Sequence, residues 1–152
     1  MSIEARIAEL GLTLPEPAKP VASYVSYVRS GHQLTISGQL SNDANGGIKG
    51  TVGVDVTPEQ ALEAARLCGL NLIAQIKAAC DGDLDRVVRI VKLGGFVQAG
   101  PDFTAIPAVI NGCSDMMVEV FGDAGKHARS AVGVYKLPLG FAVEIDAIVE
   151  IR

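Results

Sequence analysis

The chain lacks tryptophan, and only 5% of its 152 residues are aromatic. It has two histidines, His32 and His127, and three cysteines without a C-x-x-C pair. Structural zinc sites take Cys and His ligands at short, regular spacings, so almost no zinc ligands are available here. We therefore expect no metal site and no cofactor.

Runs of basic residues and long apolar runs are missing as well. Lys and Arg number 13 against 17 Asp and Glu, a net charge of −4, and the cations are scattered. Nucleic-acid-binding proteins usually carry a basic patch, so we expect no nucleic-acid partner. No stretch approaches the roughly 18 apolar residues of a membrane span, and residues 1–10 form an amphipathic segment rather than a signal peptide. We expect a cytoplasmic protein that does not contact membranes.

The cysteines, Cys68, Cys80 and Cys113, are odd in number. An odd set without paired spacing is typical of free thiols in a reducing compartment, so we interpret all three as packing residues.

What the sequence does contain is apolar: 49% of the residues are hydrophobic and 20% are charged. This length predicts one domain over residues 1–152. A small domain must keep much of its surface wet, and burying apolar surface between subunits resolves that conflict. We therefore expect a homo-oligomer.

Local patterns predict a short N-terminal helix and Pro-rich lead-in over residues 1–20, followed by the order ββαβαββ. Thr57-Pro58-Glu59-Gln60 is a helix start, with a capping threonine and a glutamine three residues later. A glycine pair at 94–95 indicates a β-bulge. The predicted helices cover 2–10, 57–80 and 107–121, and the predicted strands cover 24–29, 33–39, 87–97 and a final hairpin within 127–146. This order predicts an α+β fold, with one mixed sheet and two helices on one face.

The predicted final hairpin carries charges that a purely structural role does not require. Arg129 begins its first strand, and Glu144 lies among apolar neighbours in its second. A guanidinium offers a planar fork to a carboxylate, and a half-buried carboxylate can activate water. His127 alternates onto the same strand face as Arg129. The helix over 107–121 carries Asn111, Ser114 and Met117 at helical spacing. Together, Arg129 and Glu144 indicate a small site for an anionic substrate.

An ordered set of short elements, together with these residues, resembles one known family. The set is Tyr24, Ser37-Gly38-Gln39, Arg129-Ser130, Leu137-Pro138 and Val143-Glu144-Ile145. It resembles the Rid family of reactive-intermediate imine deaminases, also called YjgF or L-PSP proteins, over nearly the whole chain from Tyr24 onward.

The resemblance implies a chorismate-mutase-like fold and a homotrimer with sites between protomers. It implies hydrolysis of enamines and imines of short 2-keto acids, of the 2-aminoacrylate/2-iminopropanoate type, with release of ammonia. By the same likeness Arg129 grips the substrate carboxylate. Glu144 is a matching position too, and in a mechanism its carboxylate would orient or deprotonate the water that attacks the imine carbon. Tyr24, Ser37 and Asn111 are the other matching positions, and His127 is a further candidate for the pocket.

The sequence departs from the family pattern around this site. Many members have Pro-Tyr where this chain has Ser23-Tyr24, Pro-Ala-Arg where it has His127-Ala128-Arg129, and cysteine in place of Ala131. The segment 102–111 is several residues longer than in compact members. Because these differences lie around the site, they bear on the identity of the substrate more than on the fold.

Each candidate residue also has a structural interpretation. Arg129 would serve in a surface ion pair, Glu144 as a solubilising edge charge, Tyr24 as a core aromatic, Ser37 as a strand end, and His127 as a loop cap. At the level of function, two alternatives to the deaminase remain: a non-catalytic trimeric module that binds a small carboxylate, and an endoribonuclease. Scattered cations and few aromatics disfavour the endoribonuclease.

Overall fold

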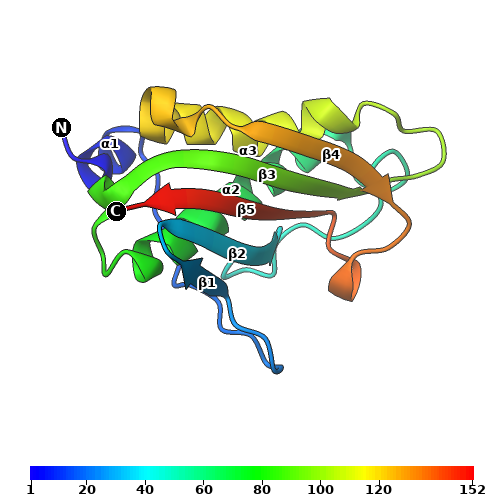
Figure 1. Ribbon diagram of the computed structural model, residues 1–152. Helices are drawn as coiled ribbons and strands as arrows, with labels where there is room; N and C mark the ends of the chain where they lie inside the picture. The colour runs from blue at the N-terminus through cyan, green and yellow to red at the C-terminus, as the bar shows by residue number, and fades with distance from the viewer.

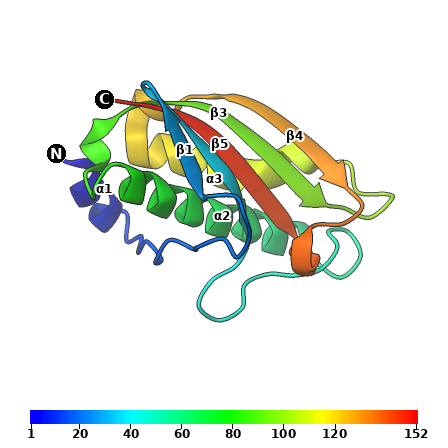
Figure 2. The same ribbon diagram turned by 60° about the horizontal axis from the view of Figure 1, so that its bottom comes forward.

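The computed structural model describes all residues 1–152, and a five-stranded sheet forms its centre. Two long helices cover one face of this sheet (Figures 1 and 2), which confirms the predicted α+β architecture and the order ββαβαββ. The strands are β1 (Tyr27–Ser30), β2 (Gln33–Leu40), β3 (Val87–Gln98), β4 (Ala128–Val134) and β5 (Val143–Ile151). The helices are α1 (Ile3–Glu9), α2 (Pro58–Ala79) and α3 (Ile106–Phe121), with 3-10 turns at Leu84–Arg86, Gly122–Gly125 and Pro138–Gly140.

The predicted final hairpin is wrong, because β4 and β5 are not neighbours. The strand order is β1-β2-β5-β3-β4, so β3 lies between them. After α3 the chain returns parallel to β3 as the edge strand β4, and the 3-10 turn then leads it across to β5 at the sheet centre. β5 is paired on both sides and buries every second residue. The central position therefore buries β5 better than a hairpin with β4 would.

The predicted bulge in β3 is also displaced. The register shifts lie between Val87 and Arg89 and between Ile90 and Lys92, while Gly94 and Gly95 pair regularly with β5. The two glycines serve close packing instead. A Cβ on Gly95 would lie 2.7 Å from Ile110 of α3, so its absence lets the helix rest directly on the strand.

Helix α2 begins as its cap predicts. Thr57 accepts the Gln60 N–H at 3.1 Å and the Gln60 side chain accepts the Thr57 N–H at 2.9 Å, which completes the capping box. The buried side of α2 includes Ala65, Gly69, Leu72 and Ile76, whereas Leu62 is 41% exposed.

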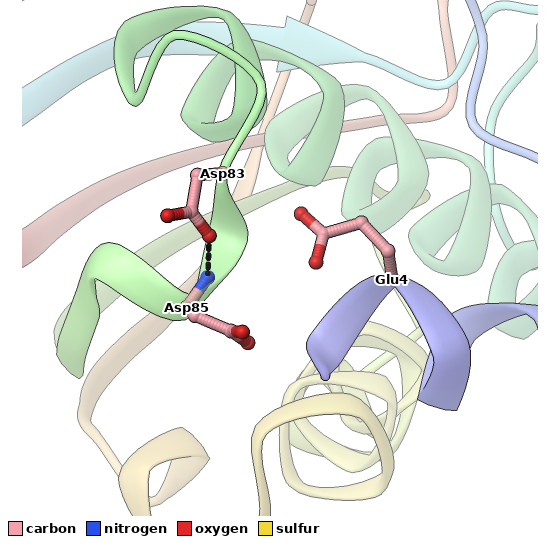
Figure 3. A group of neighbouring side chains, drawn as sticks. All are labelled: Glu4, Asp83 and Asp85. Atoms are coloured by element: carbon pink, nitrogen blue, oxygen red, sulfur yellow. Dashed lines mark hydrogen bonds between the residues drawn. The ribbon is translucent and has the colours of Figure 1, made fainter. Parts of the chain in front are cut away.

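The N-terminal helix is joined to the turn before β3 by reciprocal hydrogen bonds. The Ile3 N–H donates to Asp85 Oδ1 at 2.8 Å, and the Leu84 N–H donates to Glu4 Oε1 at 2.6 Å. Asp83 accepts the Asp85 N–H at 3.0 Å, so the three carboxylates gather at one point (Figure 3). Each carboxylate caps backbone donors, and Ile7 enters the core beside them. None of the helices is at once long enough and apolar enough to span a lipid bilayer.

Candidate functional site

Arg129 lies on the edge strand β4 with its side chain on the helix-covered face of the sheet. Its Nη1 donates to Asn111 Oδ1 at 2.7 Å and to Ser114 Oγ at 3.2 Å, both on α3. The two acceptors lie three residues apart on one side of the helix, so they contact the same nitrogen. No Asp or Glu forms a salt bridge with Arg129. The guanidinium is thus oriented by neutral groups and keeps its charge uncompensated.

His127 joins the same cluster through Ser114. Its Nε2 lies 2.8 Å from Ser114 Oγ, and its Nδ1 lies 2.6 Å from the carbonyl oxygen of Gly125. Ser114 is not among the site residues predicted from the sequence, where only its helical spacing stands out. The signal that identifies it is that same spacing, since Ser114 follows Asn111 by three residues on the predicted helix.

Glu144 lies on the opposite face of the sheet. Along β5 the odd-numbered residues Val143, Ile145 and Ala147 point toward the helices and are buried, so Glu144 and Asp146 point to the uncovered face. Burial raises the pKa of the Glu144 carboxyl, and the nearby Asp146 adds to this rise. Burial likewise raises the pKa of Asp146, although the Gly94 N–H and Lys92 oppose the rise.

The Glu144 side chain lies over the irregular part of β2. The register of β2 against β5 shifts between Ile36 and Gln39, at Ser37 and Gly38. A Cβ on Gly38 would lie 2.8 Å from Glu144 Oε1. Because Gly38 has no side chain, the Glu144 carboxylate can occupy the space next to it.

Tyr24 and Ser37 line a small cavity of about 120 Å³. Gly38, which adjoins the Glu144 carboxylate, and Asn42 line it as well. Tyr24 is 60% exposed, and Ser37 Oγ donates to the Val25 carbonyl at 2.7 Å. Ser37 has no His or carboxylate partner that would activate it as a nucleophile.

The structure therefore divides the predicted site residues, together with Ser114, into two groups. The clamp group consists of Arg129, Asn111, Ser114 and His127, at the β4 edge on the helix side. The carboxylate group consists of Glu144 on β5, Ser37 on β2 and Tyr24 in the segment before β1. One chain does not bring the two groups together, because β3 separates the strands and the side chains of Arg129 and Glu144 point to opposite faces.

The uncovered face of the sheet is partly apolar. Val132 is 46% exposed and Val28 is 55% exposed, and Phe96 and Ile148 are half-buried between them. Figure 2 shows that no helix lies on this side. An apolar surface of this kind is typical of a contact with another protein surface.

The three cysteines are free and buried. Burial raises the pKa of the Cys113 thiol to about 12, although Arg129 opposes the rise. Cys113 therefore stays protonated at neutral pH and is a poor nucleophile.

Comparison with known proteins places this geometry in context. Residues 4–148 match a family model described as "YjgF/chorismate_mutase-like, putative endoribonuclease". Protein TCP17 of Trypanosoma cruzi is 50% identical over 99% of this chain and 94% of its own length. A 2-iminobutanoate/2-iminopropanoate deaminase of Dermatophagoides farinae is 27% identical over 93% of this chain and 95% of its own.

Solved structures agree. The protein Atu1372 of Agrobacterium tumefaciens, whose function is unknown, superposes with a TM-score of 0.92 at 47% identity, covering 99% of this chain and 92% of that one. E. coli TdcF with bound serine superposes with a TM-score of 0.62 at 26% identity, covering 92% and 95%. The predicted family resemblance is thereby confirmed: this chain belongs to the YjgF/chorismate mutase-like family.

Proposed function

We propose that this protein hydrolyses 2-imino and enamine carboxylates to 2-keto acids and ammonia. The observation that carries the proposal is Arg129, a guanidinium held in place by Asn111 and Ser114 yet without an acidic partner. Such a group suits a substrate carboxylate, which accepts two parallel N–H donors from arginine. The deaminase among the relatives supports this substrate class, as does the TdcF structure with serine, a small carboxylate, bound.

In this proposal Glu144 moves the protons of the reaction. An enamine substrate first becomes the imine by taking a proton at its terminal carbon and losing one from its nitrogen. Glu144 then takes a proton from water as the water oxygen bonds to the imine carbon, and it passes that proton to the nitrogen. It then moves the hydroxyl proton to the same nitrogen. The C–N bond breaks, ammonia is released, and the 2-keto acid remains. The raised pKa of Glu144 supports this role, because proton transfer is most efficient when the pKa of the base lies near the working pH.

The complete site would form between protomers of a homotrimer, with the clamp group of one chain facing the carboxylate group of the next. Two observations support this arrangement: the two groups lie on opposite faces and toward opposite edges of one sheet, and the uncovered face exposes Val28 and Val132. A head-to-tail contact of this kind closes into a ring when its rotation is one third of a turn. The buried free thiols support a reducing compartment such as the cytoplasm.

The first test is an ammonia-release assay with imino acids generated in place by an amino acid oxidase. We expect the wild-type protein to exceed the spontaneous rate, and Glu144→Gln to lose the acceleration while still binding the 2-keto acid product. Wild-type protein that binds the 2-keto acid but releases no extra ammonia would favour the binding module. RNA cleavage by the same preparation would favour the endoribonuclease of the family description, which the net charge of −4 disfavours.

The shared site has its own test. Arg129→Lys and Glu144→Gln chains, each inactive alone, are co-expressed with different tags and purified as mixed trimers. In each mixed trimer one of the three interfaces combines an intact clamp group with an intact Glu144, so about a third of the wild-type activity should return. No recovery in a mixed trimer, or light scattering that gives a monomer, would contradict the shared site.

A further inference from the structure

A chain of hydrogen bonds runs from Arg129 back into the protein. Arg129 Nη1 contacts Ser114 Oγ at 3.2 Å, Ser114 Oγ contacts His127 Nε2 at 2.8 Å, and His127 Nδ1 contacts the Gly125 carbonyl at 2.6 Å. The chain links β4, α3 and the turn before β4. No acidic residue takes part in it.

The direction of each bond follows from its end groups. A carbonyl oxygen only accepts, so His127 Nδ1 carries the proton and donates to Gly125. In the neutral ring Nε2 is then an acceptor, so the Ser114 hydroxyl donates to it. With its hydrogen directed toward His127, Ser114 Oγ presents a lone pair to the guanidinium N–H. His127 thus orients the hydroxyl that orients Arg129.

The bonds also determine which edge of Arg129 is free. Nη1 carries two hydrogens, and Asn111 and Ser114 accept both of them. Nε and Nη2 have no acceptor within the chain, and these two nitrogens form the side edge of the guanidinium. A carboxylate can occupy that edge with two parallel hydrogen bonds.

We propose that Ser114 and His127 are positioning residues, which hold Arg129 so that a ligand carboxylate binds side-on at Nε and Nη2. The inference rests on the proposed function and assigns a role to His127 that differs from direct substrate binding. Both ring nitrogens of His127 already have protein partners, so direct contact with a ligand would require breaking one of these bonds.

The experiment compares Ser114→Ala, Ser114→Thr, His127→Phe and the double variant Ser114→Ala/His127→Phe. We expect Ser114→Ala to raise KM for the imino acid, and Kd for 2-ketobutyrate, about tenfold while kcat changes less than about threefold. Ser114→Thr keeps the hydroxyl and should restore both constants. Asp115→Ala, at the exposed neighbouring position on α3, is the control.

The double variant tests the order of the chain. If His127 acts only through Ser114, its replacement should raise KM in the wild-type background and have no effect in the Ser114→Ala background. Histidine ¹⁵N spectra give a measurement independent of turnover: neutral His127 should carry its proton on Nδ1. Thermal unfolding of each variant separates loss of fold from loss of position.

A KM and Kd for Ser114→Ala within twofold of wild type, or a neutral His127 protonated on Nε2, overturns the inference. If His127→Phe raises KM as much in the Ser114→Ala background as in the wild type, then His127 does not act through Ser114. Failure of the proposed function looks different, because the wild type then releases no ammonia. If 2-ketobutyrate binding nevertheless depends on Ser114, the positioning role is supported and the proposed deaminase activity is rejected. A wild-type protein that neither hydrolyses the imino acid nor binds 2-ketobutyrate contradicts both the proposed function and the positioning role.

Discussion

Replacing Gly38 by alanine tests whether the position of the Glu144 carboxylate governs turnover. An added Cβ would lie 2.8 Å from Oε1, 2.9 Å from Cδ and 3.0 Å from Cγ of Glu144. Non-bonded carbon atoms prefer about 3.5–4.0 Å, so the carboxylate must move by about 1 Å. Gly38 has no positive φ, so alanine suits the backbone there.

The cost to stability should be small. Pushing the Glu144 side chain away from its rotamer costs about 0.5–1.5 kcal/mol. Removing glycine from the unfolded chain returns about 0.4–1 kcal/mol. The free energy of unfolding should therefore change by less than about 1 kcal/mol, which is a shift of about 2–4 °C or less in Tm for a domain of this size.

The cost to activity should be large, because a misplacement of about 1 Å at a reacting group can lower the rate about 100-fold. The assay is kcat for ammonia release by Gly38→Ala, measured beside its Tm. In the Glu144→Gln background the same substitution should cost little more, since the carboxylate is already gone. Wild-type kcat in a folded Gly38→Ala protein would refute the reasoning, and so would an equal loss in both backgrounds.

Three further predictions concern the clamp, the pH dependence and the helix pair. Arg129→Lys should keep the fold by circular dichroism but lower kcat/KM about 30- to 1,000-fold, because an ammonium cannot form two parallel bonds; a loss of only a few-fold would reject the clamp. The pKa of Glu144 is raised above its usual 4.5 by burial, so the folded state binds this proton more tightly than the unfolded state and stability falls as pH rises through the folded pKa. Glu144→Gln should therefore raise Tm at pH 7, and the gain should fade as pH falls toward 4.5; a gain that stays constant with pH would contradict this cause. Gly112→Ala should lower the free energy of unfolding by about 1–3 kcal/mol in urea, since its Cβ would press on the Leu62 carbonyl of α2, whereas Val118→Ala on the exposed side of α3 should cost less.

Much of the fold follows from local sequence. The Thr57-Pro58-Gln60 cap satisfies its own backbone donors, so it determines the start of α2 without reference to the rest of the chain. Alternation along β5 likewise shows which side chains are buried. Signals of this kind act over a few residues, and for that reason the element order could be predicted.

Strand pairing could not be predicted in the same way. The turn at Leu137-Pro138-Leu139-Gly140 is compatible with a hairpin, but the position of β5 depends on long-range pairing with β2 and β3. The start of β1 is a similar case. Residues before Tyr27 leave the sheet, and Ser26 Oγ donates to the Ala18 carbonyl in the N-terminal lead-in.

The candidate site shows the same difference between local signals and long-range contacts. The sequence by itself determined the family, the guanidinium of Arg129 and the lone carboxylate of Glu144, because residue type and order along the chain express their chemistry directly. Only the tertiary structure decided that these two side chains point to opposite faces of the sheet and that Ser114 and His127 stand behind Arg129. The physical reason is that a side chain's face depends on which strands pair and which helix covers them, and both come from contacts between residues far apart in the sequence.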